Sequence, residues 1–294
     1  MKRTLFLLLF LLLFLLLLLP LLVGCTDPET PIAEETPLPS DTPAPTQKVE
    51  EVVVSVATEE PVVTATPVPT PPLCGITIGI DPGHQRIYNR DLEPIAPNST
   101  EKKVKVAGGT RGIASRVYEY EVVLDVGLLL RDLLEEAGAT VVMTRTSHDV
   151  NLSNMERALL FNEHEVDLAI RLHCNGTDDE NVRGAFMLIP AEQRTQHFET
   201  NERAATLILA RYLEETELPM RGRDGVMRRS EQTGFNWCTQ PILCIELGHM
   251  SNRTEDLLLT SPEFQQKMAQ GLYNGIYDFF LGEETESDET PVFP

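Results

Sequence analysis

Two histidines and one glutamate each stand at or just beyond the end of a short apolar segment that is typical of a β-strand. His84 follows GITIGID, His173 ends VDLAIRLH, and Glu246 ends QPILCIE. In open α/β sheets, functional groups gather at the carboxyl ends of the strands, so we expect these three side chains to meet at one edge. Two histidines and a carboxylate are the ingredients of a catalytic zinc site, although a single histidine at a strand end is more often structural.

A further carboxylate ligand is expected at the start of the next helix, in the segment YEYE. Its two candidates are Glu119 and Glu121. Steps of 3.6 residues from Glu119 meet only apolar residues, whereas steps from Glu121 meet a mixed face that includes Asp125 and Asp132. Glu119 therefore lies at the start of the apolar face of the helix, which is expected to be buried, and it is the better candidate for the ligand. The alternative is a first-turn glutamate that merely suits the helix dipole.

The segments that must position these residues alternate between strand and helix patterns. This alternation predicts an α/β fold, a single three-layer domain with a mostly parallel, mixed sheet flanked by helices. The expected strands are 75–81, 139–144, 166–173, 185–189 and 240–246, and the expected helices are 119–137, 151–163, 202–215 and 262–280. Gly138 should end the first helix, and Asn151 or Ser153 should cap the second.

The residues before this region are of a different kind. Residues 1–24 resemble a lipoprotein signal peptide, in which a long Leu/Phe run ends at Cys25, the residue that would carry the lipid. The alternative is a transmembrane helix, because the run approaches the roughly 20 residues needed to span a bilayer. Residues 25–73 are rich in Pro, Thr and Glu and predict a disordered tether with a reach on the order of 100 Å. Residues 74–282 would form the folded domain and residues 283–294 an acidic, disordered tail.

Charge and cysteine content exclude several classes of protein. A net charge of -21 with a pI near 4.6 argues against nucleic acid binding and against electrostatic attachment to anionic lipid. The chain has no CxxC pair, so a cysteine-based zinc site is not expected. A Cys238–Cys244 disulfide is conceivable after export, but Cys174 and Cys244 have the surroundings of small buried residues.

Five ordered motifs resemble the catalytic domain of zinc-dependent N-acetylmuramoyl-L-alanine amidases. They are IGIDPGHQ, GTRGIASRVYEYEVVLD, TVVMTRTSHDVNLSNMERA, LAIRLHCNG and IELGHMSN, and together they cover nearly all of residues 74–281. The resemblance implies that His84, Glu119 and His173 bind zinc and that Glu246 is the catalytic residue. It also implies hydrolysis of the amide between N-acetylmuramic acid and L-alanine in peptidoglycan. The expected protein is then a monomer, held by Cys25 at the outer face of the bacterial cytoplasmic membrane and reaching the cell wall.

The chain departs from the family pattern at several places. Arg171 and Cys174 flank His173 where smaller residues are often found, and His249 stands where many members have an aromatic residue. The loop 85–117 is long and is expected to border the substrate groove. Arg157 is expected to form a structural ion pair.

Two other functions remain open from the sequence. One is a zinc peptidase that acts on wall peptides, and the other is a wall-binding lipoprotein without catalysis. Against the second, the chain keeps all four of the family's site residues.

Overall fold

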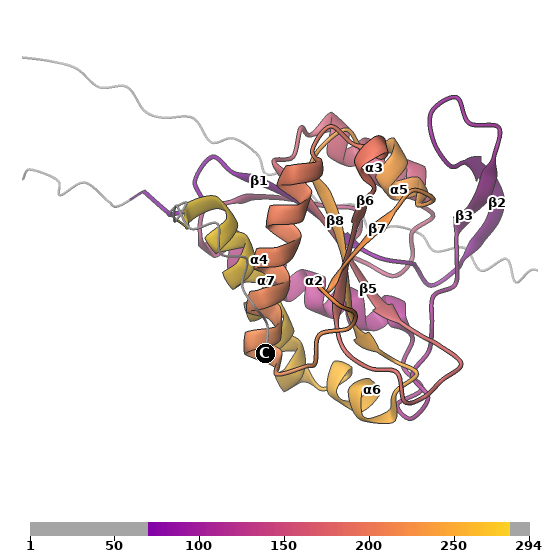
Figure 1. The fold of residues 1–294 in the computed structure, drawn as a ribbon, viewed down its shortest axis with the longest axis vertical. Coiled ribbons are helices and arrows are strands. Elements are labelled where there is room, and N and C mark those ends of the chain that lie inside the picture. Colours follow the sequence, from indigo (N-terminus) through magenta and orange to yellow (C-terminus); the bar gives the residue numbers. More distant parts are fainter. Residues whose placement is uncertain (1–69, 283–294) are drawn as a thin grey trace, which may run out of the picture. The chain divides into compact units, whose positions relative to one another are not determined.

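The central element is a six-stranded sheet with the strand order β4-β1-β5-β8-β6-β7 in the computed structural model, which describes residues 70–282 (Figure 1). The predicted signal peptide, Cys25, the tether up to residue 69 and the acidic tail lie outside the described residues. The strands are β1 (Thr77–Pro82), β4 (Thr140–Met143), β5 (Leu168–Asn175), β6 (Phe186–Pro190), β7 (Val226–Arg229) and β8 (Ile242–His249).

The sheet is mostly parallel, as the alternation of strands and helices predicts. Strand β1 runs parallel to β4 and β5, and β5 runs parallel to β8. Strand β6 is antiparallel to β8 and parallel to β7, which makes the sheet mixed. The carboxyl ends of β1, β5 and β8 therefore lie side by side at one edge of the sheet.

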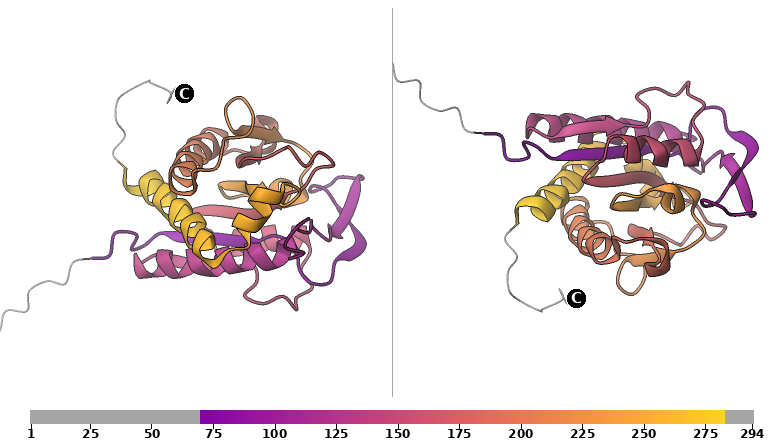
Figure 2. Two further views of the ribbon diagram at one scale, coloured as in Figure 1. Left: turned by 90° about the horizontal axis from the view of Figure 1, so that it is seen from below. Right: turned by 90° about the horizontal axis from the view of Figure 1, so that it is seen from above.

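Helices cover both faces of this sheet and complete three layers (Figures 1 and 2). The helices are α2 (Glu119–Glu136), α3 (Asn154–Glu163), α4 (Phe198–Thr216), α5 (Thr233–Trp237), α6 (Arg253–Leu259) and α7 (Pro262–Leu281). The larger apolar core packs α2, α4 and α7 against one face, and it includes Leu73 at the end of the predicted tether. The smaller core packs Phe161 of α3 and Phe235 of α5 against the other face. The predicted three-layer α/β class is confirmed.

Helix ends follow the local sequence signals. Ser153 caps α3, with its side chain accepting a hydrogen bond from the N–H of Glu156, which selects it over Asn151. Gly138 follows α2 with a φ of 93°, a left-handed conformation that glycine adopts without strain. Helix α4 begins at Phe198, four residues before the expected start. Helices α5 and α6 and strand β7 are too short for their periodicity to have predicted them.

The segment 85–117, expected to be a long loop, contains two strands. Strands β2 (Asn89–Pro94) and β3 (Lys102–Val106) form a separate antiparallel hairpin in this segment. Five hydrogen bonds tie the hairpin to the domain. Asn154 Nδ2 donates to the Lys105 carbonyl, Lys103 Nζ to the Glu231 carbonyl, Trp237 Nε1 to the Pro94 carbonyl, Asn89 Nδ2 to Asn151 Oδ1, and the Met155 N–H to Glu93 Oε1. The only Trp of the chain is therefore an anchor for the hairpin.

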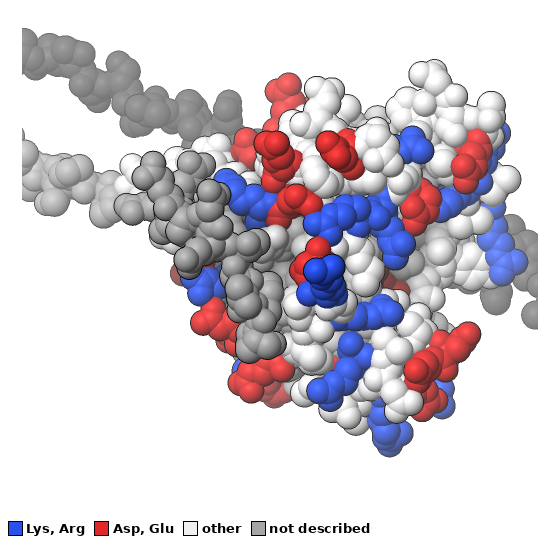
Figure 3. Space-filling model, viewed as in Figure 1, with Lys and Arg blue, Asp and Glu red and all other residues white. Residues whose placement is uncertain are grey.

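The face of the domain seen in Figure 3 carries acidic and basic side chains intermingled, without one large region of a single sign. Within residues 70–282, no helix has both the length and the apolar content needed to cross a bilayer. The four cysteines of the same range are all free thiols, so Cys238 and Cys244 do not form a disulfide.

Candidate metal centre and active site

Three side chains from different segments meet at the carboxyl edge of the sheet. His84 follows β1, Glu119 begins α2, and His173 lies near the end of β5. Glu119 Oε1 lies 3.2 Å from His84 Nε2 and 3.0 Å from His173 Nδ1, and the two ring nitrogens are 3.1 Å apart. We call these three residues the His–Glu–His cluster. The structure thus brings together the three ligands that the family resemblance implies.

The donor set of the cluster fits a small divalent cation. Two imidazole nitrogens and a carboxylate oxygen face one another, and a single proton cannot satisfy all three lone pairs. Ligand atoms at about 2.0–2.1 Å from a tetrahedral zinc lie roughly 3.3 Å apart, close to the separations within the cluster. Among residues 70–282, this is the only group of three or more His, Cys, Asp or Glu side chains arranged closely enough to hold a metal ion.

Glu119 is held in place by two backbone hydrogen bonds. The Thr110 N–H donates to Oε2 at 2.8 Å, and the Cys174 N–H donates to Oε1 at 3.0 Å. As the helical phase predicts, Glu119 is buried, with 2% of its surface exposed. The Glu121 carboxylate instead accepts the Tyr118 N–H, so Glu121 is the first-turn residue that caps the helix.

The two histidines are oriented by their neighbours. His84 Nδ1 lies 2.8 Å from the Ala107 carbonyl, so it donates there and leaves Nε2 free to face the cluster. The His173 ring lies against Gly83, where any Cβ would overlap it. His173 Nε2 is buried and has no hydrogen-bond partner among the described residues.

Burial and mutual contact shift the pKa of each cluster member. Burial lowers the pKa of His173 to about 4, although its hydrogen bond with Glu119 acts in the opposite direction. Burial also disfavours the charged forms of His84 and Glu119. Their mutual attraction outweighs this effect, raising the pKa of His84 and holding that of Glu119 well below its usual range. A neutral His173 and an ionised Glu119 are the protonation states that bind a cation.

Glu246 lies on β8 directly beside His173 in the register of the two parallel strands. Its Oε2 atom is buried and has no hydrogen-bond partner within residues 70–282. Burial, together with the nearby Glu119 carboxylate, raises the pKa of Glu246 to about 8. A carboxyl group in this state can take up and release a proton near neutral pH, as a general base and acid must.

A pocket of about 230 Å³ opens beside the cluster. His84, His173 and Glu246 line it, together with residues from three other segments: Lys103, Val104, Val106 and Ala107 of the 85–117 segment, Asn154 of α3, and Glu231, Gln232, Thr233 and Gly234 around α5. The prediction that the 85–117 segment borders the groove is confirmed for the part around β3. The contribution of the residues around α5 was not predicted, since no motif in that stretch signals it.

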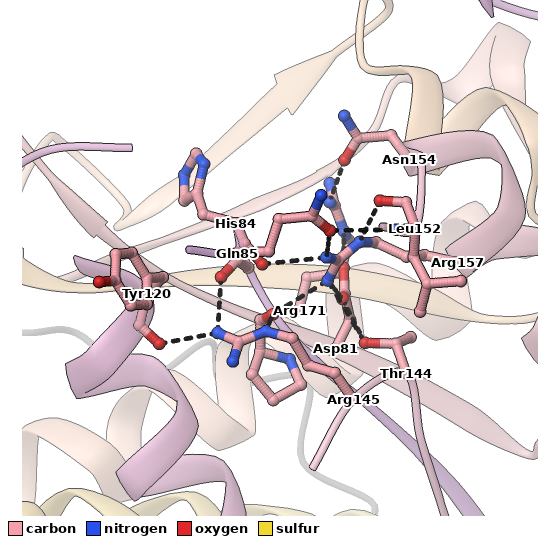
Figure 4. A network of polar contacts seen from close by, with 12 residues as sticks. Asp81, His84, Gln85, Tyr120, Thr144, Arg145, Leu152, Asn154, Arg157 and Arg171 are labelled. Atoms are coloured by element: carbon pink, nitrogen blue, oxygen red, sulfur yellow. Dashed lines mark hydrogen bonds and ion pairs between the residues drawn. The ribbon is translucent and has the colours of Figure 1, made fainter. Parts of the chain in front are cut away.

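Beneath the pocket lies a buried network of ion pairs (Figure 4). Asp81 Oδ1 accepts hydrogen bonds from Arg157 Nη1 at 2.6 Å and from Thr144 Oγ1 at 2.7 Å, and Oδ2 accepts one from Arg171 Nε at 2.8 Å. Arg157 Nη2 also donates to the His84 carbonyl at 2.9 Å, which fixes the backbone of that residue. The predicted structural ion pair of Arg157 is confirmed.

His249 does not line the pocket. It is fully buried, packs against the Phe186 ring at a centroid distance of 6.1 Å, and has no hydrogen bond at either ring nitrogen within the described part of the chain. Cys174 is also buried, and burial raises its thiol pKa well above the ordinary value. Neither residue therefore competes with Glu246 for a role in proton transfer.

Comparisons with known proteins agree on one family. A family model described as N-acetylmuramoyl-L-alanine amidase matches residues 78–278, which include all four candidate site residues. The germination-specific N-acetylmuramoyl-L-alanine amidase of Bacillus subtilis is 29% identical over 239 residues, covering 75% of this chain and 84% of that protein. An N-acetylmuramoyl-L-alanine amidase of Mycobacterium tuberculosis is 25% identical over 220 residues, covering 70% and 87%. The solved structure of Ami1, an N-acetylmuramyl-L-alanine amidase of Mycobacterium abscessus, superposes with a TM-score of 0.63 at 25% identity and covers 70% of this chain and 99% of that one.

Proposed function

The chain belongs to the N-acetylmuramoyl-L-alanine amidase family, and we propose that its catalytic centre is the His–Glu–His cluster together with Glu246. The protein is an enzyme that hydrolyses the amide bond between N-acetylmuramic acid and L-alanine in peptidoglycan. The observation that carries the proposed centre is the triangle of ligand atoms, with sides of 3.0–3.2 Å, formed by His84, Glu119 and His173.

We propose zinc as the metal of this site. Imidazole nitrogen and carboxylate oxygen are ligands that zinc accepts, and three protein ligands leave a coordination position open. When bound, zinc would act as a Lewis acid toward the scissile carbonyl and would lower the pKa of a water molecule. His84 Nε2, Glu119 Oε1 and His173 Nδ1 would hold it, because these are the atoms that face one another.

Glu246 is the proposed general base and acid. A Glu246 carboxylate oxygen would accept a proton from the attacking water as the new C–O bond forms at the scissile carbon. The same carboxyl would then donate that proton to the nitrogen of L-alanine as the C–N bond breaks, so the products are a muramic acid carboxylate and a free amine. The raised pKa of Glu246 supports this double role, since the carboxyl retains the proton between the two transfers.

Membrane attachment of the enzyme is a proposal from the sequence. Residues 1–24 would direct export, Cys25 would carry the lipid anchor, and the Pro/Thr/Glu-rich residues up to 73 would form the tether of the catalytic domain, residues 74–282. Diacylation would give stable anchoring at the outer face of the cytoplasmic membrane, because two acyl chains suffice where one does not. We propose that the anchored enzyme is a monomer.

The test is product analysis of wall digested by the purified chain. We expect intact glycan strands and free stems that begin with the L-alanine amine, and we expect both to disappear when the metal is removed by a chelator and to return with added zinc. Stems cut between two amino acids would identify a wall peptidase instead. Wall that is bound but never cut would identify a binding protein.

A further inference from the structure

Arg171 lies on the same face of β5 as His173. The two residues are two positions apart, and successive side chains of a strand alternate between faces, so both point to the same side. In the register with β8, Arg171 is opposite Cys244 and His173 is opposite Glu246. The Arg171 side chain accordingly lines the same pocket as His84, His173 and Glu246, although only 6% of its surface is exposed.

Two of the three guanidinium nitrogens of Arg171 are used within the protein. Nε donates to Asp81 Oδ2 at 2.8 Å, and Nη2 donates to Asn154 Oδ1 at 2.8 Å. Nη1 has no hydrogen-bond partner among residues 70–282. Because the other two nitrogens fix the plane of the guanidinium, Nη1 is a preoriented donor at the wall of the pocket.

Gly234 of α5 packs closely against this guanidinium. A Cβ at Gly234 would lie 2.9 Å from both Cζ and Nη1 of Arg171, closer than real Cβ contacts. The φ of Gly234 is not in the left-handed region, so the backbone itself does not require glycine here. The absence of a side chain therefore lets α5 pack this closely against Arg171 without displacing its guanidinium.

Arg171 shares its ion-pair partner with a second arginine. Asp81 supplies one negative charge, and it is shared between Arg171 and Arg157 at 2.8 and 2.6 Å. Among the described residues, Arg145, beside them, donates only to backbone carbonyls, those of Pro82, Gly83, Tyr120 and Ser147 (Figure 4). A buried guanidinium with a free N–H favours a charged hydrogen-bond acceptor over a neutral one.

We propose that Arg171 is a specificity-determining residue that binds a carboxylate of the stem peptide through Nη1. This inference rests on the proposed amidase function of the same pocket. The glycan offers only hydroxyl and acetamido groups next to the scissile bond, whereas the stem carries a carboxylate on the acidic residue that follows alanine. That group exists either as the free acid or as the amide, and Arg171 selects the free acid.

The test compares two muramyl peptides that differ only in this group, one with L-alanyl-D-glutamate and one with L-alanyl-D-isoglutamine. For the wild-type chain we expect kcat/KM to favour the free acid by roughly tenfold or more, the scale of a charge-assisted hydrogen bond. Arg171→Gln should bring the ratio near one. Gly234→Ala should also reduce it, although the charge remains. Arg157→Lys is the matched control, because Arg157 contacts the same Asp81 but does not line the pocket. It should change stability and leave the ratio as in the wild type.

Calorimetric binding of the two free stems provides a readout that does not depend on turnover. The wild-type chain should bind the acid stem roughly tenfold more tightly than the amide stem, and Arg171→Gln should bind them equally. Equal binding of the two stems by the wild type, or a preference unchanged in both Arg171→Gln and Gly234→Ala, would overturn the inference. If the wild-type chain discriminates in binding but cleaves neither muramyl peptide, the proposed function fails and the binding role of Arg171 stands.

Discussion

The Cys174 backbone N–H donates a 3.0 Å hydrogen bond to Glu119 Oε1, the same oxygen that lies 3.0 Å from His173 Nδ1. The start of α2 is thereby fixed against the end of β5 at the position where the metal is proposed to bind. The other carboxylate oxygen is fixed by the Thr110 N–H. Backbone N–H donors therefore hold both carboxylate oxygens of Glu119 in position before a metal binds. This explains why position 119 needs a carboxylate.

Glu119→Gln should weaken metal binding. The amide is a poor ligand, and its NH₂ group would face the N–H of either Thr110 or Cys174, both of which are donors. Zinc measured after dialysis should be well below one per chain, and excess zinc should restore part of the activity. Glu121→Gln is the control, because within residues 70–282 its carboxylate accepts only the Tyr118 N–H. Full zinc retention by Glu119→Gln would contradict the ligand assignment.

Glu246→Gln should separate chemistry from metal binding. The cluster remains intact, so the variant should keep zinc and bind wall fragments. Turnover should fall by roughly two or more orders of magnitude, the usual contribution of a general acid–base group. Bound zinc and kcat are measured on the same preparation. A fully active variant would mean that the base lies elsewhere.

Gly83→Ala should displace the His173 ring and so disturb the His–Glu–His cluster. The added Cβ would overlap the His173 ring, and the φ of Gly83 is not in the left-handed region, so the effect is steric. We expect lower zinc affinity with an unchanged far-UV circular dichroism spectrum. A variant with wild-type zinc affinity would show that the His173 ring can move without cost.

Asp81→Asn should destabilise the fold by about 3–5 kcal/mol near neutral pH, because it leaves two buried guanidiniums without their counter-charge. Burial alone would raise the pKa of Asp81, but Arg157 and Arg171 hold it well below its usual range. The stabilisation by Asp81 is therefore fully present above the unfolded-state pKa of about 3.9 and is lost as the pH falls further.

Unfolding free energies of both proteins between pH 3 and pH 7, measured with denaturant, check this prediction. The difference between them should be constant in the upper part of the range and should narrow below about pH 4. Asp132→Asn, at an exposed pair with Arg131, is the control and should change stability by about 1 kcal/mol or less. A difference that grows on acidification would mean that Asp81 is protonated in the folded state.

Cys25→Ser should release the enzyme from membranes without changing the kcat of the soluble domain, because the proposed anchor is a lipid on Cys25. Fractionation of cells into membrane and soluble material is the measurement. A variant that stays in the membrane fraction would identify the apolar run before Cys25 as a transmembrane helix.

Local patterns predicted most of the sheet and the position of Glu119. The apolar runs before His84, His173 and Glu246 were long enough to be read as strands, and the helical phase separated Glu119 from Glu121. The hairpin of β2 and β3 was missed because its segments, NRDLEP and KKVKV, are mostly exposed and polar, and the apolar alternation in KKVKV includes only two valines.

The role of Arg171 could not be read from its position in the chain. A charged residue inside an apolar strand is tolerated here because Asp81, 90 residues earlier, supplies the counter-charge. Gly234, 63 residues later, lets α5 approach the guanidinium closely. Such partners depend on which strands become neighbours, which local propensity does not determine.

The hydrogen bond from Trp237 to the Pro94 carbonyl places a fluorescent side chain beside the pocket. It joins α5 to the β2–β3 hairpin, and residues of both elements line the pocket. Since Trp237 is the only Trp in the chain, all indole fluorescence comes from this contact between α5 and the hairpin. A displacement of the hairpin that broke this bond would change the polarity around the indole, so the emission wavelength would report such a displacement in the unlabelled enzyme.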